Sequence, residues 1–169
     1  MSRKPEIGEL AEIDWKGIKW KAAHGDLSVP ELLTILKGFG PMEVLRFEKP
    51  GCYHGELSLC ITEEGNKEIT LYYLEVTGRK RAGEGKAALR FLRKIFNGEL
   101  FVEDPGTIRV ENATEESLLF WLKMFREGLV DALECEHCVL HSGLSESDLD
   151  MIEVELRRLT GREKEPGGQ

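Results

Sequence analysis

Hydrophobic residues recur at two spacings along the chain, and the change between them divides the chain into elements. From Ser28 onward they follow a helical period for about three turns, and Ser28 and Glu31 have the spacing of a capping box. Between about residues 42 and 76 they run apolar or alternate every second position, interrupted by Pro-Gly and Glu-Gly-Asn turn signals. This pattern predicts one helix followed by three antiparallel strands joined by hairpins.

The second half of the chain alternates between helix-like and strand-like stretches. Helical spacing predicts three more helices: Lys86 to Asn97, Asn112 or Thr114 to Leu129, and a last helix from Ser145. FVED with TIRVEN, and later ALECEHCVLH, have the pattern of strands. The order predicts a mixed α/β domain of the α+β type, with a mostly antiparallel central sheet flanked by helices. The hairpins exclude a purely doubly wound parallel sheet.

The length of 169 residues suits one domain. We expect residues 1–27 to form an N-terminal extension of uncertain structure, 28–159 a single domain, and 160–169 a disordered tail. No apolar run approaches the roughly 20 residues of a membrane helix, and the N-terminus lacks the apolar core of a secretory signal. These features predict a cytoplasmic protein with no membrane partner and with its four cysteines reduced.

Charge is distributed unevenly. The net charge of −8 argues against a nucleic-acid partner, because such binders neutralise phosphates with Lys and Arg. Residues 79–94 nevertheless carry seven cations and a single acidic residue, Glu84. Gly83 and Gly85 lie among them, between a predicted strand and a predicted helix, and glycine lets a backbone approach an anion closely. The stretch predicts a site for a multiply charged phosphate ligand; the plainer alternative is a strand–helix turn with a solvated basic face.

Two common phosphate motifs do not fit this loop. A P-loop requires Ser or Thr after Gly-Lys, and here Ala87 follows Lys86. A dinucleotide-binding fingerprint requires a third glycine where Ala88 stands.

The loop resembles motif A of the GNAT superfamily of acyl-CoA N-acyltransferases, Gln/Arg-x-x-Gly-x-Gly/Ala, with Lys80 where the family prefers Gln or Arg. A second segment is similar to the family's next strand and helix, since Asn112 precedes a helix with the aromatic pair Phe120-Trp121. The resemblance covers residues 43–133. It implies a GNAT-like fold, acetyl-CoA or another acyl-CoA as co-substrate, and direct transfer of the acyl group to an amine acceptor.

The resemblance also implies roles for particular residues. Backbone amides of Arg81 through Lys86 would hold the pyrophosphate, in the loop Lys80, Arg81, Ala82, Gly83, Glu84, Gly85 and Lys86. The strand with Leu74 and Val76 would pair with the pantetheine arm, and Asn112 would lie beside the cofactor. Glu68 and Glu75 are the candidate bases, although both could be ordinary strand carboxylates, and Asn112 could simply cap a helix.

Family members often protonate the leaving thiolate with a tyrosine from the last conserved helix, and this chain has Trp121 at the nearest position. Trp121 is expected in the core. The missing tyrosine leaves a second hypothesis open, an acyl-CoA-binding or interaction module with weak or no catalysis. The acceptor also stays open between aminoglycoside, polyamine, amino acid and protein N-terminus. Exposed strand edges make a homodimer plausible.

A third hypothesis, a small metal-stabilised domain, comes from Cys135 and Cys138, which are separated by two residues near His141. A structural zinc site needs four ligands, and Cys52 with His54 would have to complete the set. We therefore assign no metal site. Redox activity of this pair is not favoured either, because no thioredoxin-like βαβ unit precedes it.

Overall fold

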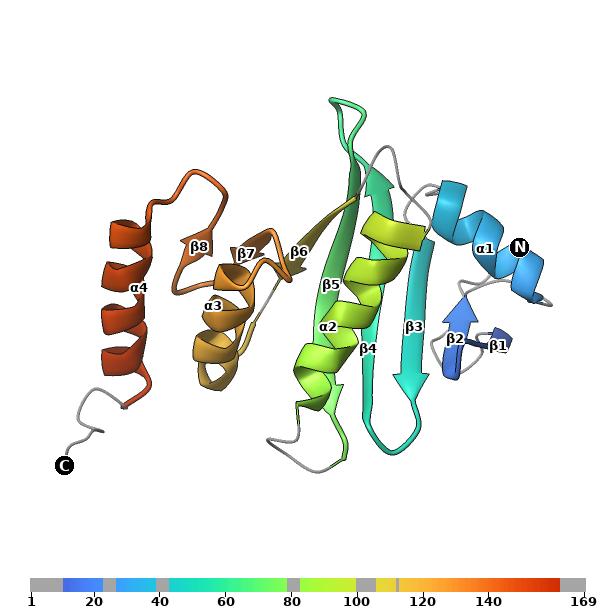
Figure 1. Ribbon diagram of the computed structural model, residues 1–169, viewed down its shortest axis with the longest axis horizontal. Coiled ribbons are helices and arrows are strands. Elements are labelled where there is room, and N and C mark those ends of the chain that lie inside the picture. Colours follow the sequence, from blue (N-terminus) through green and yellow to red (C-terminus); the bar gives the residue numbers. More distant parts are fainter. Residues whose placement is uncertain are drawn as a thin grey trace, which may run out of the picture.

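The computed structural model describes residues 11–22, 27–38, 43–78, 83–99, 106–111 and 113–161. Within them, eight strands form one sheet in the order of the sequence (Figure 1). The strands are β1 Ala11–Trp15, β2 Ile18–Ala22, β3 Glu43–Lys49, β4 Tyr53–Ile61, β5 Lys67–Val76, β6 Thr107–Glu111, β7 Ala132–Glu134 and β8 Val139–Leu140. The α-helices are α1 Val29–Gly38, α2 Glu84–Lys94, α3 Leu118–Arg126 and α4 Glu146–Leu159.

The sheet is mixed. Strands β1 to β5 pair antiparallel with their neighbours, β5, β6 and β7 are parallel, and β8 turns back against β7. Helix α2 connects β5 to β6 and α3 connects β6 to β7, as parallel pairing requires a crossover. The described residues therefore form an α+β domain with a mostly antiparallel sheet, which is the class that the hydrophobic pattern predicts.

The hairpin of β1 and β2 lies within residues 1–27, where the sequence predicted no element. Its two-residue turn has positive φ at Lys16 (60°) and Gly17 (77°), the conformation of the tight turns that join antiparallel strands. Strand β2 continues into the main sheet by pairing with β3. Its alternate residues Ile18, Trp20 and Ala22 are buried, so the hairpin supplies part of the core.

The core lies between the sheet and α2, which runs over β4 and β5 in Figure 1. Trp20 from β2 contacts Phe47 of β3 and Phe91 of α2, with ring centroids 5.8 and 6.3 Å apart. Buried leucines of α2 and apolar positions of β4 and β5 extend this cluster. The alternation of β4 therefore reflects one face against α2 and one polar face.

The first helix starts at its predicted capping signal. Ser28 and Glu31 form the reciprocal hydrogen bonds of a capping box, with Ser28 N–H donating to Glu31 at 2.9 Å and Glu31 N–H to Ser28 at 3.2 Å. The helix predicted from Lys86 begins two residues earlier and continues as a π-helical turn over Ile95–Glu99. The next helix begins with a 3₁₀ turn at Glu115–Ser117, preceded by Thr114.

The structure corrects one strand prediction and confirms part of another. The stretch ALECEHCVLH is not one strand, because β7 and β8 are short and Cys135 to Cys138 form the turn between them. The stretch FVED lies outside the described residues, whereas TIRVEN contains β6.

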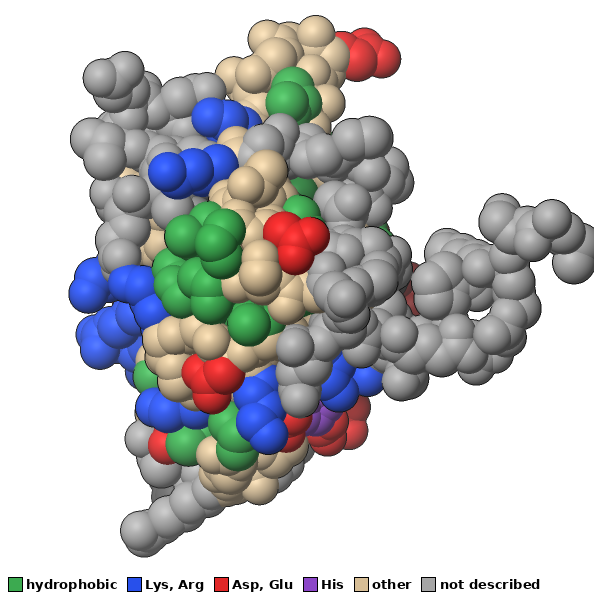
Figure 2. Space-filling view, turned by 90° about the vertical axis from the view of Figure 1, so that its right-hand side faces the viewer, with side chains coloured by type: hydrophobic (Ala, Val, Ile, Leu, Met, Phe, Trp, Pro, Cys, Tyr) green, Lys and Arg blue, Asp and Glu red, His purple; other side chains and the backbone are tan. Residues whose placement is uncertain are grey.

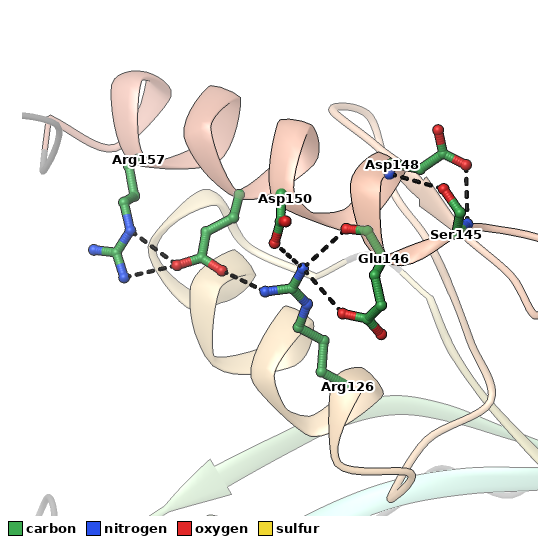
Figure 3. A network of polar contacts seen from close by, with 7 residues as sticks. Arg126, Ser145, Glu146, Asp148, Asp150 and Arg157 are labelled. Carbon is green, nitrogen blue, oxygen red and sulfur yellow. Dashed lines mark hydrogen bonds and ion pairs between the residues drawn. The ribbon is translucent and has the colours of Figure 1, made fainter.

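Helix α4 packs on the outer side of α3, and Arg126 joins the two (Figure 3). The Arg126 guanidinium lies 2.6 Å from Asp150 and 2.9 Å from Glu153, and Glu146 is 3.7 Å away. One cation thus faces three carboxylates of α4. These ion pairs orient α4, while its Leu149 and Leu156 supply the buried contacts.

The last helix begins at Ser145, as predicted, and Ser145 forms a capping box that the sequence did not predict. Its side chain accepts from Asp148 N–H at 3.1 Å, and Asp148 accepts from Ser145 N–H at 2.9 Å. Ser145→Ala is expected to lower the free energy of unfolding by about 1 kcal/mol in urea titrations. Ser147→Ala, in the same exposed turn, is the matched control and should change little.

The capping box also predicts a pH dependence. Hydrogen bonds from Ser145 hold the pKa of Asp148 below its ordinary value of 3.8. A lowered folded-state pKa stabilises the fold above that ordinary value, and the contribution is lost as pH falls through the folded pKa. Asp148→Asn removes the carboxylate but keeps its shape, so the difference in unfolding free energy between wild type and Asp148→Asn should shrink in acid. A difference that stays constant from neutral pH into acid would contradict the assigned role of Asp148.

Figure 2 looks onto the side of the molecule where β1, β2 and α1 lie. Apolar side chains gather in the middle of this view, with Lys and Arg side chains around them and fewer acidic ones.

Candidate functional site

The pairing between strands β5 and β6 ends halfway along β5. Among the described residues their pairing runs from Glu68↔Thr107 to Leu71↔Val110 and ends there. At the same level the β4–β5 register shifts by one residue, so Tyr72 is the extra residue of a β-bulge. Within the described part of the chain, the remaining stretch Leu74–Val76 is paired with β4 and with no strand on its other side. Its other edge therefore offers main-chain groups to a ligand.

The N-terminus of α2 lies beside this free edge. Gly83 precedes the helix in a left-handed conformation, with φ of 82°, and no side chain of the described residues caps the first turn. The carbonyl of Gly83 accepts from Ala87 N–H at 2.9 Å, while the amides of Glu84, Gly85 and Lys86 precede the first helical bond. Such a helix end attracts anions, because its free N–H groups and dipole both favour negative charge.

Gly85 lets three elements meet closely at this point. A Cβ on Gly85 would lie 3.0 Å from the Phe120 ring of α3 and 3.6 Å from Val76 of β5. Phe120 in turn packs edge-on against Trp121, with ring centroids 4.9 Å apart. The glycine therefore sets the spacing between α2, α3 and the free end of β5.

A cleft of about 1160 Å³ opens between these elements. Its lining combines Leu74, Glu75 and Val76 of β5 with Gly83 to Lys86 at the start of α2. Helix α3 forms the opposite wall with mainly apolar side chains, among them Leu119 and Phe120. An elongated ligand with an anionic end and an apolar or amide-bearing arm matches this arrangement.

Lys86 is the cation that the described residues place in the cleft from α2. Its Nζ lies 2.6 Å from Glu127 just after α3, and both side chains are about one-third exposed, at 32%. The ammonium group of Lys86 is the largest cause that holds the pKa of Glu127 below its ordinary value. Glu127 therefore stays ionised and neutralises part of the positive charge at the helix end.

Glu75 has a histidine partner. Its carboxylate lies 2.9 Å from Nε2 of His54, the residue directly opposite it on β4, and its side chain is 66% exposed. The His54 ring contacts Tyr73 edge-on, at 5.6 Å between centroids. This arrangement fixes the imidazole beside a carboxylate that is open to solvent, which is a geometry suited to proton transfer.

Glu68 lies at the opposite end of β5. It is paired with Cys60, whose Sγ approaches its carboxylate at 3.8 Å, and it is absent from the lining of the cleft among the described residues. The structure therefore does not bring the two candidate bases together. Burial and the charge of Glu68 raise the pKa of the Cys60 thiol.

Most cofactor-binding residues inferred from the resemblance fall on this cleft. Leu74, Val76, Gly83, Glu84, Gly85 and Lys86 line it, with Glu75 between the first two. Lys80, Arg81, Ala82 and Asn112 lie outside the described residues. Trp121 is 4% exposed and belongs to the core, as expected.

Sequence reasoning missed the proximity of three residues to the site: His54, Phe120 and Glu127. The position of His54 depends on the strand register, and that of Glu127 depends on how α3 packs. Phe120 was noted as half of an aromatic pair, but the sequence carried no signal that it would touch Gly85.

Two of the three tyrosines are engaged within the sheet and its core. Tyr53 is 2% exposed, and burial is the largest cause that raises its pKa to about 12, followed by Cys52 and Glu84. The Tyr72 hydroxyl is hydrogen-bonded to Ser58 at 2.9 Å. The cleft lining, as far as the chain is described, contains no tyrosine.

Within the described ranges no three His, Cys, Asp or Glu side chains are grouped closely enough to hold a metal ion. Cys52 and His54 therefore do not complete a ligand set with Cys135 and Cys138.

The described helices also include none with the length and apolar character needed to span a membrane. Comparisons with models of protein families, with curated proteins and with solved structures found no match.

Proposed function

We propose that this chain is an acyl-CoA-dependent N-acyltransferase of the GNAT type. The observation that carries the proposal is the cleft, where Leu74–Val76 meets the N-terminus of α2; among the described residues no strand pairs with the outer edge of Leu74–Val76 and no side chain caps the helix. A coenzyme A ester has the matching shape, with a pyrophosphate at one end and an amide-bearing arm that leads to the thioester. The loop motif around Gly83 and Gly85 points to the same ligand class.

The pyrophosphate would bind at the helix end. The amides of the first turn of α2 donate to its oxygens, and Gly83 and Gly85 add no side chain that would block the approach. Lys86 adds a positive charge that Glu127 now balances. The pantetheine amides would then pair with the free edge of β5, in the manner of an added strand.

The chemical step would take place where β5 leaves β6. The amine nitrogen attacks the thioester carbonyl carbon, the carbon–sulfur bond breaks, and the CoA thiolate leaves. Main-chain N–H groups on the outer edge of β5 would stabilise the negative charge that develops on the carbonyl oxygen. Glu75, held by His54, would take the proton of the amine directly or through water.

A binding module without efficient turnover is the second candidate. The observation in its favour is that the described cleft lining offers no tyrosine to protonate the thiolate. Water would have to supply that proton. Acyl-CoA binding is common to both functions, and only acylation of an amine panel separates them.

The test of the proposal is calorimetric titration with acetyl-CoA and longer acyl-CoAs. Wild type should bind, and Gly83→Asp should bind about tenfold more weakly or worse, because it places a negative charge at the helix end. Gly65→Asp is the matched control: Gly65 also has a positive φ, 88°, and open space, but it lies in the β4–β5 turn. No binding by wild type, or equal losses in both variants, would overturn the proposal.

Glu127→Gln should increase the affinity for acyl-CoA. Removing this carboxylate frees Lys86 for the phosphates, so acyl-CoA should bind roughly two- to fivefold more tightly. Glu64→Gln, in the exposed β4–β5 turn, removes the same charge far along the sheet and is the control. An equal gain in both variants would show only the effect of net charge.

A further inference from the structure

The turn between β7 and β8 holds two cysteines in register. The ladder pairs Leu133 with Leu140 and Glu134 with Val139, and its next rung places Cys135 opposite Cys138. Cys135 N–H donates to the carbonyl of Cys138 at 3.1 Å, which confirms that the pairing continues. Residues directly opposite one another on neighbouring strands point to the same face, so both thiols lie on one side of the turn.

The two sulfur atoms are already close. Their Sγ atoms are 3.8 Å apart, and both side chains are half-buried, neither sealed in the core nor fully exposed. Directly opposite strand positions have Cα separations of about 4.5 to 5.5 Å, within the range that a disulfide tolerates. Closing the bond therefore requires side-chain rotation, without a rearrangement of the strands.

We propose that Cys135 and Cys138 form a redox-active dithiol that exchanges with small-molecule disulfides. The sequence alone argued against such a role, because no thioredoxin-like unit precedes the pair. The inference comes from the strand register and the sulfur–sulfur distance. It is independent of acyl transfer.

The exchange consists of two displacements. The Cys135 thiolate attacks one sulfur of the small disulfide, whose sulfur–sulfur bond breaks and releases one thiolate. Cys138 then gives up its proton to that thiolate and attacks the Cys135 sulfur; the mixed disulfide bond breaks, and the second small thiolate leaves and takes a proton from solvent. The dithiol is oxidised by two electrons and the small disulfide is reduced to two thiols.

The order of attack follows from the surroundings of the two thiols. Burial is the largest cause that raises the pKa of Cys138 to about 12, with Cys135 as the second cause. Cys138 therefore stays protonated at neutral pH, and the nucleophile must be a thiolate. The first attack falls to Cys135, and Cys138 reacts only once the adjacent mixed disulfide has formed.

The turn also has a defined place in the sheet. Cys135 follows β7, which is parallel to β6 and β5, so it lies at the carboxyl edge of the three parallel strands. The free end of β5 lies at the same edge. Oxidation of the dithiol would therefore change the turn on the side of the sheet that carries the cleft.

The test uses the full chain in buffers of reduced and oxidised glutathione, followed by acid quenching, alkylation and peptide mass mapping. Folded wild type should form the Cys135–Cys138 disulfide at a glutathione ratio about tenfold less oxidising than the urea-denatured chain requires, because the fold holds the thiols together. A denatured chain that forms it as readily as the folded one would overturn the proposal, and this comparison needs no variant.

Variants test the order of attack. Cys138→Ser should accumulate a stable glutathione adduct on Cys135, whereas Cys135→Ser should leave Cys138 largely unmodified. A Cys52→Ser, Cys60→Ser double variant is the control and should still form the Cys135–Cys138 disulfide. Adducts on Cys138 that equal those on Cys135 would overturn the assignment of the nucleophile.

Discussion

Trp20→Ala is expected to lower the free energy of unfolding by about 3 to 5 kcal/mol. Trp20 is fully buried, and its indole contacts Phe47 of β3, Phe91 of α2 and, at 6.3 Å between centroids, Trp15 of β1. Its removal leaves a cavity where the N-terminal hairpin, the main sheet and a helix meet. Such a cavity is costly because the three elements cannot all move in to fill it.

Trp20→Phe is the matched control. It keeps a ring in the cluster and removes the indole N–H, which is buried without a hydrogen-bond partner in the described residues. The smaller ring and the removed polar group act in opposite directions, so the net change should stay below about 1.5 kcal/mol. Urea titration followed by far-UV circular dichroism measures both variants. Equal losses, or no loss for Trp20→Ala, would show that the hairpin is not an integral part of the core.

The same tryptophan shows why the sequence did not reveal the hairpin. The pattern Ile18, Trp20, Ala22 alternates correctly, but the tight turn uses Lys16 with positive φ, where asparagine, aspartate or glycine would be the usual signal. The helices were easier to predict. Ser28 and Ser145 are helix-starting residues whose capping partners lie three positions on, and such local start signals can be read directly from the sequence.

The end of the sheet was harder to predict because its strands are very short. Strands β7 and β8 have three and two residues, which is too few to establish an alternating pattern. Each of these two strands is stabilised by pairing with its neighbouring strands and not by the β propensity of its own residues. The turn at Cys135 and Cys138 therefore looked like the interior of one longer strand.

Some parts of the candidate site could likewise be predicted from the sequence, and others could not. Glycines 83 and 85 mark the start of α2 in the sequence: Gly83 has φ of 82°, which favours glycine, and a Cβ on Gly85 would lie tightly against Phe120, at 3.0 Å. The pairing of Glu75 with His54 could not be predicted, because it depends on the bulge at Tyr72. The register set by the β4–β5 turn would, without the bulge, pair His54 with Leu74. A shift by one residue moves every following side chain to the other face.

The bulge therefore has two structural consequences for the end of β5. It turns Glu75 to the face that carries His54 and turns Leu74 and Val76 toward α2, while all three residues border the cleft. A ligand that lies along the free edge of β5 would border both faces. The proposed base and the proposed cofactor site are thus placed on the same strand segment but serve different parts of the reaction.

On this basis, Glu75→Gln is expected to lower kcat for amine acylation by about 10²- to 10⁴-fold, the range of a lost general base. The amide keeps the shape of the side chain but accepts no proton at neutral pH. Acyl-CoA affinity, measured by calorimetry, should stay within about twofold of wild type, because the proposed phosphate contacts come from α2. Steady-state kinetics with an amine panel and acetyl-CoA measures the change.

Glu68→Gln is the control, since it removes a carboxylate from the far end of β5, where Glu68 lies beside Cys60. Its kcat should equal that of wild type. His54→Gln should fall between the two variants, because it leaves the Glu75 carboxylate in place but removes the group that positions it. If Glu68→Gln loses turnover while Glu75→Gln retains it, the base is at the other end of the strand and the role given to the bulge is wrong.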